Sequence, residues 1–162
     1  MTEESKSRQL IKVAETLPYL PDLSFRSGNY WKIYKQAKNF YKKEWRNKEK
    51  PSKTFGNKII YATNYGWTHL VGKTVTTNFA DATKRLKHLP NAQQIIEKAN
   101  FIYETVKEVD KGGKIVNRYS LLGKLEDGTI LKVVVKEAGD RLIFVTVYSP
   151  AKIKRDSKET QA

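Results

Sequence analysis

The sequence predicts an α+β fold, in which N-terminal helices are followed by a four-stranded antiparallel meander sheet. In the first 100 residues, apolar side chains recur at the three- and four-residue spacing of amphipathic helices. After Asn100 the chain changes to short strand-like runs separated by turn sequences. With 39% apolar and 11% aromatic residues, the composition is that of a chain that folds around a core.

Two helices are expected before residue 55. The first covers Ser5–Leu17 and is ended by Pro18. The second covers Asn29–Asn47, and lysines flank a largely aromatic stripe on it. The stripe consists of Tyr30, Ile33, Tyr34, Ala37, Phe40, Tyr41 and Trp45. We interpret it as a core-facing surface, and a surface that stacks on nucleic-acid bases is the alternative.

One short strand and further helices are expected between residues 56 and 100. Lys58–Tyr61 has the pattern of the strand, and Trp67–Val75 that of an extended piece or a short helix around His69. Asn78 can cap the next helix. The buried side of that helix would comprise Phe79, Ala82, Leu86 and Leu89. Pro90 ends it and can open the last helix, Asn91–Lys98.

Four consecutive strands are expected to form the sheet: Phe101–Val109, Ile115–Leu125, Thr129–Lys136 and Arg141–Tyr148. The strongest turn signal between them is Asp127-Gly128. Alternation along the last strand predicts that Leu142, Phe144, Thr146 and Tyr148 share one face, with Thr146 and Tyr148 about 7 Å apart. The expected organisation is a basic helical extension (1–55), a sheet-containing domain (56–150) and a polar tail (151–162).

The composition disfavours several kinds of site. Cysteine is absent, which excludes disulfides, zinc–thiolate sites and cysteine nucleophiles. His69 and His88 lie nineteen positions apart, which is not a metal-binding spacing, so no metal ion or other cofactor is expected. No apolar run approaches the roughly 20 residues of a membrane span, and the polar N-terminus does not have the pattern of a signal peptide. We expect a cytoplasmic site of action, with delivery by secretion or by a phage as the route that needs no signal peptide.

The charge points to a polyanionic partner. The net charge is +14, from 31 basic and 17 acidic residues. The excess is uneven, because residues 31–58 alone hold ten Lys/Arg and two Glu. Such a surface attracts phosphate backbones or anionic membranes. A solvated helix face is the alternative interpretation.

The residue types present suit the cleavage of RNA without a metal. That reaction needs a base for the 2′-OH proton, an acid for the 5′-oxygen, and cations or donors for the phosphate oxygens. Histidine can be either acid or base near neutral pH, which makes His69 and His88 candidates. Thr146 and Tyr148 could hold a phosphate with their hydroxyls, or they could fill the rim of the core.

Three stretches carry a resemblance to a known superfamily. They are Trp67-Thr68-His69-Leu70, the segment from Leu89-Pro90 to Ile102-Tyr103, and Val145-Thr146-Val147-Tyr148-Ser149-Pro150. In this order they resemble the barnase–EndoU–colicin E5/D–RelE-like (BECR) ribonuclease superfamily, most closely its phage-associated and polymorphic-toxin branches. The resemblance covers about residues 57–150. It implies helices followed by an antiparallel sheet of about four strands.

The resemblance also implies a function and a site. The protein would be a toxin-type endoribonuclease that cleaves RNA, with tRNA among the candidate substrates, by transesterification to a 2′,3′-cyclic phosphate. The implied catalytic residues are His69, Thr146, Tyr148 and His88. The implied RNA-binding residues are Lys73, Lys84, Arg85, Lys87, Arg118, Lys132 and Ser149. Such a toxin needs a neutralising partner, which would be an acidic immunity or antitoxin protein.

Two other hypotheses stay open. One is a non-catalytic RNA- or DNA-binding module that uses the Asn29–Asn47 helix. The other is a structural phage- or secretion-associated domain whose charge only aids solubility. Expression in bacteria should be toxic under the ribonuclease hypothesis and harmless under the other two.

Overall fold

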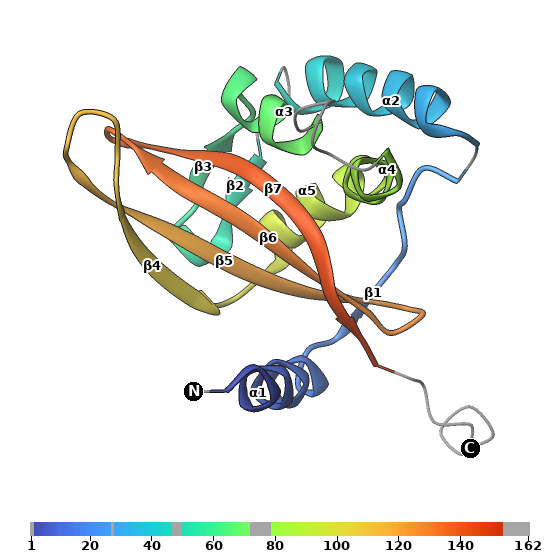
Figure 1. Ribbon diagram of the computed structural model, residues 1–162, viewed down its shortest axis with the longest axis horizontal. Helices are drawn as coiled ribbons and strands as arrows, with labels where there is room; N and C mark the ends of the chain where they lie inside the picture. Colours follow the sequence, from blue (N-terminus) through green and yellow to red (C-terminus); the bar gives the residue numbers. More distant parts are fainter. Residues whose placement is uncertain (1, 27, 47–49, 72–78, 154–162) are drawn as a thin grey trace.

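The computed structural model describes residues 2–26, 28–46, 50–71 and 79–153. Its fold is α+β, as the sequence predicts, with helices on both sides of one large sheet (Figure 1). The prediction of a four-stranded antiparallel meander is wrong, because the described sheet is mixed and has seven strands. No helix in the described ranges is long and apolar enough to cross a membrane.

The helical elements precede the long strands in the chain. They are α1 (Glu3–Glu15), α2 (Tyr30–Asn39), the π-helical turn η1 (Phe40–Trp45), the 3₁₀ turn η2 (Lys53–Phe55), α3 (Asn64–Val71), α4 (Phe79–Lys87) and α5 (Leu89–Lys98). Side chains cap the first two, since Thr2 accepts from the Ser5 N–H and Asn29 from the Lys32 N–H. The single helix predicted at Asn29–Asn47 consists of α2 followed directly by the π turn η1, which ends at Trp45. Of the two readings for Trp67–Val75, the helix is confirmed up to Val71. The remaining four residues of that stretch, and the predicted cap Asn78, lie outside the described residues.

Three short strands extend the predicted four-stranded sheet, and one of them, β3, is the strand predicted at Lys58–Tyr61. The strands are β1 (Tyr19–Leu20), β2 (Lys50–Ser52), β3 (Lys58–Tyr61), β4 (Glu104–Val109), β5 (Ile115–Leu125), β6 (Thr129–Ala138) and β7 (Arg141–Lys152). Strands β4 to β7 pair in succession and antiparallel. Strand β1 pairs parallel with the end of β5, and β3 pairs parallel with β7. These added strands have two to four residues, which is too short for a periodic pattern to show how they pair.

A bulge in β7 changes which side chains share a face. Thr146 pairs with Val134 but Phe144 pairs with Val135, so Val145 is an extra residue on β7. Phe144 is buried in the main core, whereas Thr146 and Tyr148 lie outside it. The prediction that Leu142, Phe144, Thr146 and Tyr148 share one face is therefore wrong. Thr146 and Tyr148 do share a face, which is the one opposite Phe144.

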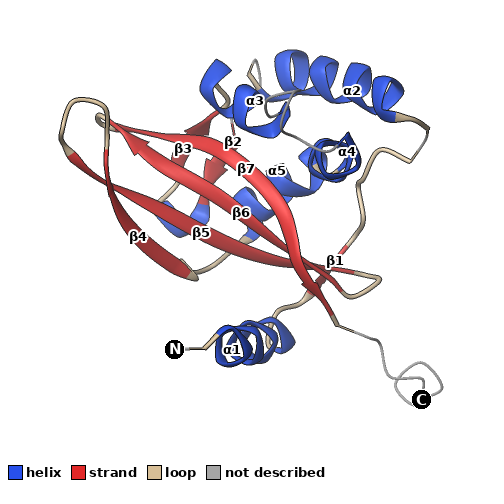
Figure 2. Ribbon diagram, viewed as in Figure 1, coloured by secondary structure: helices blue, strands red, loops and turns tan. Residues whose placement is uncertain are grey.

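The main core lies between the sheet and the helices α2 to α5 (Figure 2). The aromatic stripe is part of this core, as predicted: Tyr41 and Trp45 are fully buried, and the Trp45 ring lies 4.6 Å from that of Phe144. Residues on both sides of the expected boundary at 55 and 56 thus share one core. Helix α1 packs on the opposite face of the sheet through Leu10 and Ala14, against Leu122 and Ile130.

The chain reverses at Asp127-Gly128, as the turn signal predicts. Gly128 has a φ of 90°, and a Cβ there would lie 1.9 Å from the carbonyl oxygen of Ile153. The Ile153 N–H donates to the Gly128 carbonyl at 2.8 Å. Strand β7 consequently continues to Lys152, four residues beyond its predicted end, and residues 154–162 of the expected tail lie outside the described ranges.

Candidate functional site

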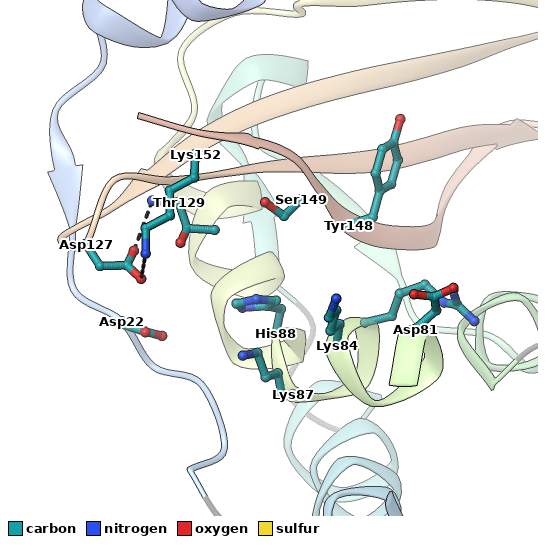
Figure 3. A pocket seen from close by; sticks show the side chains of 11 residues that line it. Asp22, Asp81, Lys84, Lys87, His88, Asp127, Thr129, Tyr148, Ser149 and Lys152 are labelled. Atoms are coloured by element: carbon teal, nitrogen blue, oxygen red, sulfur yellow. Dashed lines mark hydrogen bonds and ion pairs between the residues drawn. The ribbon is translucent and has the colours of Figure 1, made fainter. Parts of the chain in front are cut away.

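The residues predicted to act together fall into two groups, one on each side of β7. The first group lies on the sheet face that α2 to α5 do not cover. The second lines a cleft between α4 and β7. Tyr148 belongs to both, because it lines the cleft while its ring points away from the α4 lysines (Figure 3).

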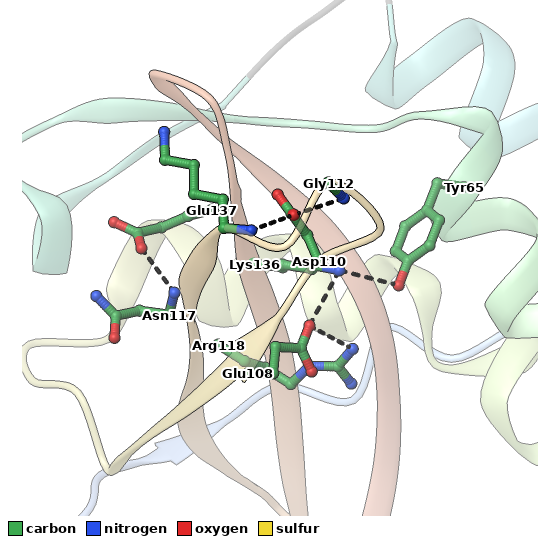
Figure 4. Close-up of polar contacts among 9 residues, drawn as sticks. Tyr65, Glu108, Asp110, Gly112, Asn117, Arg118, Lys136 and Glu137 are labelled. Atoms are coloured by element: carbon green, nitrogen blue, oxygen red, sulfur yellow. Dashed lines mark hydrogen bonds and ion pairs between the residues drawn. The ribbon is translucent and has the colours of Figure 1, made fainter.

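One end of the sheet face carries what we call the sheet-face cluster: Tyr65, His69, Glu108, Arg118 and Lys136. The Glu108 carboxylate accepts from Lys136 at 3.0 Å and from Arg118 at 3.2 Å (Figure 4). The Lys136 ammonium also lies 3.5 Å from the Tyr65 hydroxyl. Arg118 and Lys136 are paired residues on β5 and β6, so the register of the sheet itself brings the two cations together.

Helix α3 brings His69 to this cluster. Tyr65 and His69 are one turn apart on α3, and their rings lie 4.6 Å apart. Gly66 allows α3 to approach β7 closely, because a Cβ at this position would lie 2.3 Å from the Phe144 carbonyl oxygen. Any larger residue at position 66 would push α3, and His69 with it, away from the sheet.

The electrostatics of the cluster keep His69 neutral near pH 7. Partial burial lowers the pKa of His69, and the positive charges of Arg118 and Lys136 lower it further, against a smaller opposing effect of Glu108. Hydrogen bonding to Lys136 lowers the pKa of Glu108. The cluster therefore offers a neutral imidazole beside two cations that share one carboxylate.

The other end of the same face carries Lys132 and Tyr148, which are paired residues of β6 and β7. The Lys132 ammonium lies 2.8 Å from Glu104 and 6.0 Å from the centre of the Tyr148 ring. Burial opposes the charge of Lys132, but the hydrogen bond to Glu104 and the nearby Tyr148 outweigh it and raise the pKa of Lys132. Lys132 and Lys136 are four residues apart on β6, about 14 Å at ~3.4 Å per residue.

Thr146 lies on this face between the two ends, paired with Val134. Its hydroxyl oxygen is buried and has no hydrogen-bond partner among the described residues. A phosphate could reach this oxygen only if neighbouring side chains moved.

The second group lines what we call the α4–β7 cleft, which has a volume of about 530 Å³ (Figure 3). Its lining residues are Asp22, Asp81, Lys84, Arg85, Lys87, His88, Asp127, Thr129, Tyr148, Ser149 and Lys152. Six of the residues predicted from the sequence are among them. Arg85 is partly engaged, since its Nε donates to the Leu70 carbonyl at 3.0 Å.

The His88 side chain lines this cleft and does not belong to the sheet-face cluster. It is 7% exposed, and burial, reinforced by the charge of Lys87, lowers its pKa to about 4. Its Nδ1 lies 3.0 Å from the Asn91 amide nitrogen and 3.2 Å from the Ser24 hydroxyl. His69 and His88 have no neighbours in common among these contacts, so the structure does not bring the two histidines together.

The sequence reasoning missed Tyr65, Glu108 and Lys136. The spacing of Tyr65 and His69, one helical turn apart, was a usable signal once the segment was taken as a helix. Lys136 follows from alternation with Lys132 on β6, but no local pattern indicated Glu108. The predicted RNA contact Lys73 lies outside the described residues.

Within the described ranges, no group of three or more His, Asp or Glu side chains is placed to hold a metal ion. Comparison of the chain with protein-family models, with curated proteins and with solved structures found no match. The functional inference therefore depends on the geometry of the site.

Proposed function

We propose that this protein is a metal-independent endoribonuclease whose reaction takes place at the sheet-face cluster. The observation that carries the proposal is a chain of contacts: the His69 ring lies 4.6 Å from that of Tyr65, and the Tyr65 hydroxyl lies 3.5 Å from the Lys136 ammonium. Lys136 is in turn the strand partner of Arg118. A neutral base next to two cations is what attack of a 2′-hydroxyl on a phosphodiester requires.

In the proposed reaction His69 is the general base. It takes the proton of the 2′-hydroxyl, and the 2′-oxygen forms a bond to phosphorus. Because its pKa is lowered, His69 is unprotonated and ready to accept at neutral pH. Arg118 and Lys136 stabilise the negative charge that grows on the non-bridging oxygens, and they turn from Glu108 toward the phosphate as it binds.

The bond from phosphorus to the 5′-oxygen then breaks, and this oxygen needs a proton. Tyr65 is the donor that we assign, since its hydroxyl is beside Lys136, whose charge stabilises the resulting phenolate. Tyr148 is about 14 Å further along the face by strand geometry. We assign to Tyr148 and Lys132 the binding of a neighbouring part of the RNA. The products are a 2′,3′-cyclic phosphate and a 5′-hydroxyl.

The proposal is tested by incubating RNA with the purified protein in EDTA and identifying the ends. Cleavage with cyclic-phosphate products is expected, and His69→Ala should lower the rate by about 10²–10⁴-fold, as loss of a general base does. Tyr65→Phe should also lower the rate. Tyr19→Phe, which removes a hydroxyl from an exposed tyrosine on β1, is the matched control and should leave it unchanged. Products with 3′-hydroxyl ends, or a His69→Ala variant that is folded and fully active, would refute the mechanism.

A ribonuclease acting inside cells would need to be restrained, and we infer an acidic immunity or antitoxin protein as its partner. The net charge of +14 favours such a partner electrostatically. Co-expression with the partner should remove the toxicity of the wild-type chain, whereas His69→Ala should be harmless without it.

The binding-module hypothesis keeps one observation in its favour. Most of the aromatic stripe is buried, but Trp31 on α2 is 62% exposed next to the exposed Lys32 and Lys35. This surface could stack on single-stranded bases. Binding of RNA that is lost in Trp31→Ala, with no cleavage by the wild-type chain, would favour this function over the nuclease.

A further inference from the structure

The α4–β7 cleft contains a hydrogen-bond donor whose orientation is set by its neighbours. The Asn91 Oδ1 accepts from the Leu23 N–H at 2.8 Å and from Gln94 at 3.1 Å. This fixes the amide, so that the Asn91 nitrogen, which can only donate, faces the His88 Nδ1 at 3.0 Å. The same amide nitrogen lies 3.1 Å from the Asp22 carboxylate and 3.0 Å from the Ser24 hydroxyl. Because it cannot accept from Nδ1, we assign Nδ1 as an acceptor and the hydrogen of the neutral imidazole to Nε2.

Ser24 also neighbours this nitrogen, with its hydroxyl 3.2 Å from Nδ1. Because that hydroxyl donates to the Asp22 carboxylate, its oxygen could only accept, and the contact with Asn91 alone carries the assignment. The Nε2–H of His88 has no partner within the described part of the chain, although the residue is more than nine-tenths buried and lines the cleft. A donor that lines a cleft and has no protein partner is available to an acceptor that binds there.

Two cations of the cleft are also unpaired. Lys84 and Lys87, one turn apart on α4, have no ion-pair partner among the described residues, and both line the cleft beside His88 (Figure 3). Two of the three carboxylates in the lining are already engaged, Asp22 by Ser24 and Asn91, and Asp127 by the Thr129 N–H and Lys152. Asp81 is the third. Donors and free positive charge together suit a phosphate.

The cleft and the sheet face meet across the edge of β7. Strand β3 pairs with β7 only at Leu142 and Ile143, so the edge from Phe144 onward has no strand beside it in the described sheet. Beyond that point Tyr148 projects its ring to the sheet face while Ser149, the next residue, lines the cleft. A flexible single strand could cross this edge from one site to the other.

We propose that the α4–β7 cleft is a second binding site of the enzyme, which holds a phosphate of a nucleotide flanking the cleaved bond of single-stranded RNA. Lys84 and Lys87 neutralise the phosphate, and the His88 Nε2–H donates to one of its oxygens. The cleft volume of about 530 Å³ is in the range of small-molecule sites, which leaves room for a nucleotide. The inference rests on the proposed ribonuclease function. It also changes the predicted role of His88 from catalysis to binding.

The test compares cleavage of a dinucleotide, which is too short to span both sites, with that of a single-stranded octanucleotide. The variant is Lys84→Gln/Lys87→Gln, and the control is Lys12→Gln/Lys98→Gln, an equal charge change on exposed lysines of α1 and α5. For the octanucleotide, the first variant should raise KM about tenfold or more, the loss expected when a charge-assisted contact is removed. Its kcat, and both constants for the dinucleotide, should be unchanged. His88→Asn, which keeps an acceptor for Asn91 but lacks the Nε2 donor, should act in the same direction.

Equal effects on the two substrates, or equal effects of the two double variants, would overturn the proposal, because they indicate general charge attraction. If the protein cleaves no RNA, the proposed function fails but the cleft can still be tested. Fluorescence anisotropy with a labelled octanucleotide at fixed salt should then show weaker binding for Lys84→Gln/Lys87→Gln than for the control. Identical affinities would leave the cleft with no role in RNA binding.

Discussion

The pH dependence of stability offers a direct test of the buried network at His88. In the unfolded chain the pKa of His88 has its ordinary value near 6.5, but in the folded protein burial lowers this pKa to about 4. Between these values the unfolded state binds more protons than the folded state. The contribution of the neutral His88 to the free energy of unfolding is therefore complete above pH 6.5 and is lost as the pH falls toward 4.

The size of the effect follows from the shift. Its full extent is about 3 kcal/mol, and integration from about pH 7 to about pH 4.5 gives a loss of about 2 kcal/mol. No large discount for solvent applies, because His88 is only 7% exposed. The charged groups that affect it are Lys87, which favours the neutral ring, and Asp22 and Asp127, which oppose it.

The assay is urea unfolding of the wild-type chain and of His88→Asn at these two pH values. The Asn oxygen replaces Nδ1 as the acceptor for Asn91 but does not titrate. The wild type should lose about 2 kcal/mol more than the variant on acidification, because the carboxylates titrate in both proteins. His69→Asn is the control and should lose nearly as much as the wild type, since His69 is exposed. If the wild type and His88→Asn show the same loss, burial does not hold His88 neutral in the folded protein, and the acceptor role assigned to its Nδ1 is wrong.

Two further predictions concern the core and the sheet face. Thr146→Val should raise the free energy of unfolding by about 1 kcal/mol, because it removes a buried hydroxyl without a partner and because Val is a better strand residue. The cleavage rate should stay unchanged. A large fall in this rate would show that Thr146 belongs to the catalytic group. Trp45→Ala should cost about 3–5 kcal/mol in urea unfolding, because this fully buried residue joins the N-terminal helices to Phe144, and a cost below about 1 kcal/mol would mean that residues before 55 do not share the core.

Local signals in the sequence were sufficient for the class of fold and for most elements. The bounds of β3 and β5 agree with the predicted strands, because Lys58–Tyr61 and Ile115–Leu125 are runs of apolar and β-branched residues bounded by turn residues. The aromatic stripe was recognisable because its helical period puts Ile33, Ala37 and Tyr41 on one side. Both kinds of pattern depend only on neighbouring residues.

The composition of the candidate sites was decided by the tertiary structure. The sheet-face cluster exists because strand register pairs Arg118 with Lys136 and because Gly66 lets α3 approach β7. The separation of His69 from His88 depends on where α3 and α4 each pack along the sheet, and no local pattern encodes that. The bulge at Val145 is the clearest case. An alternating pattern in the sequence does not reveal a single extra residue. Because side chains on a strand alternate with a period of two, one such residue moves every later side chain to the other face.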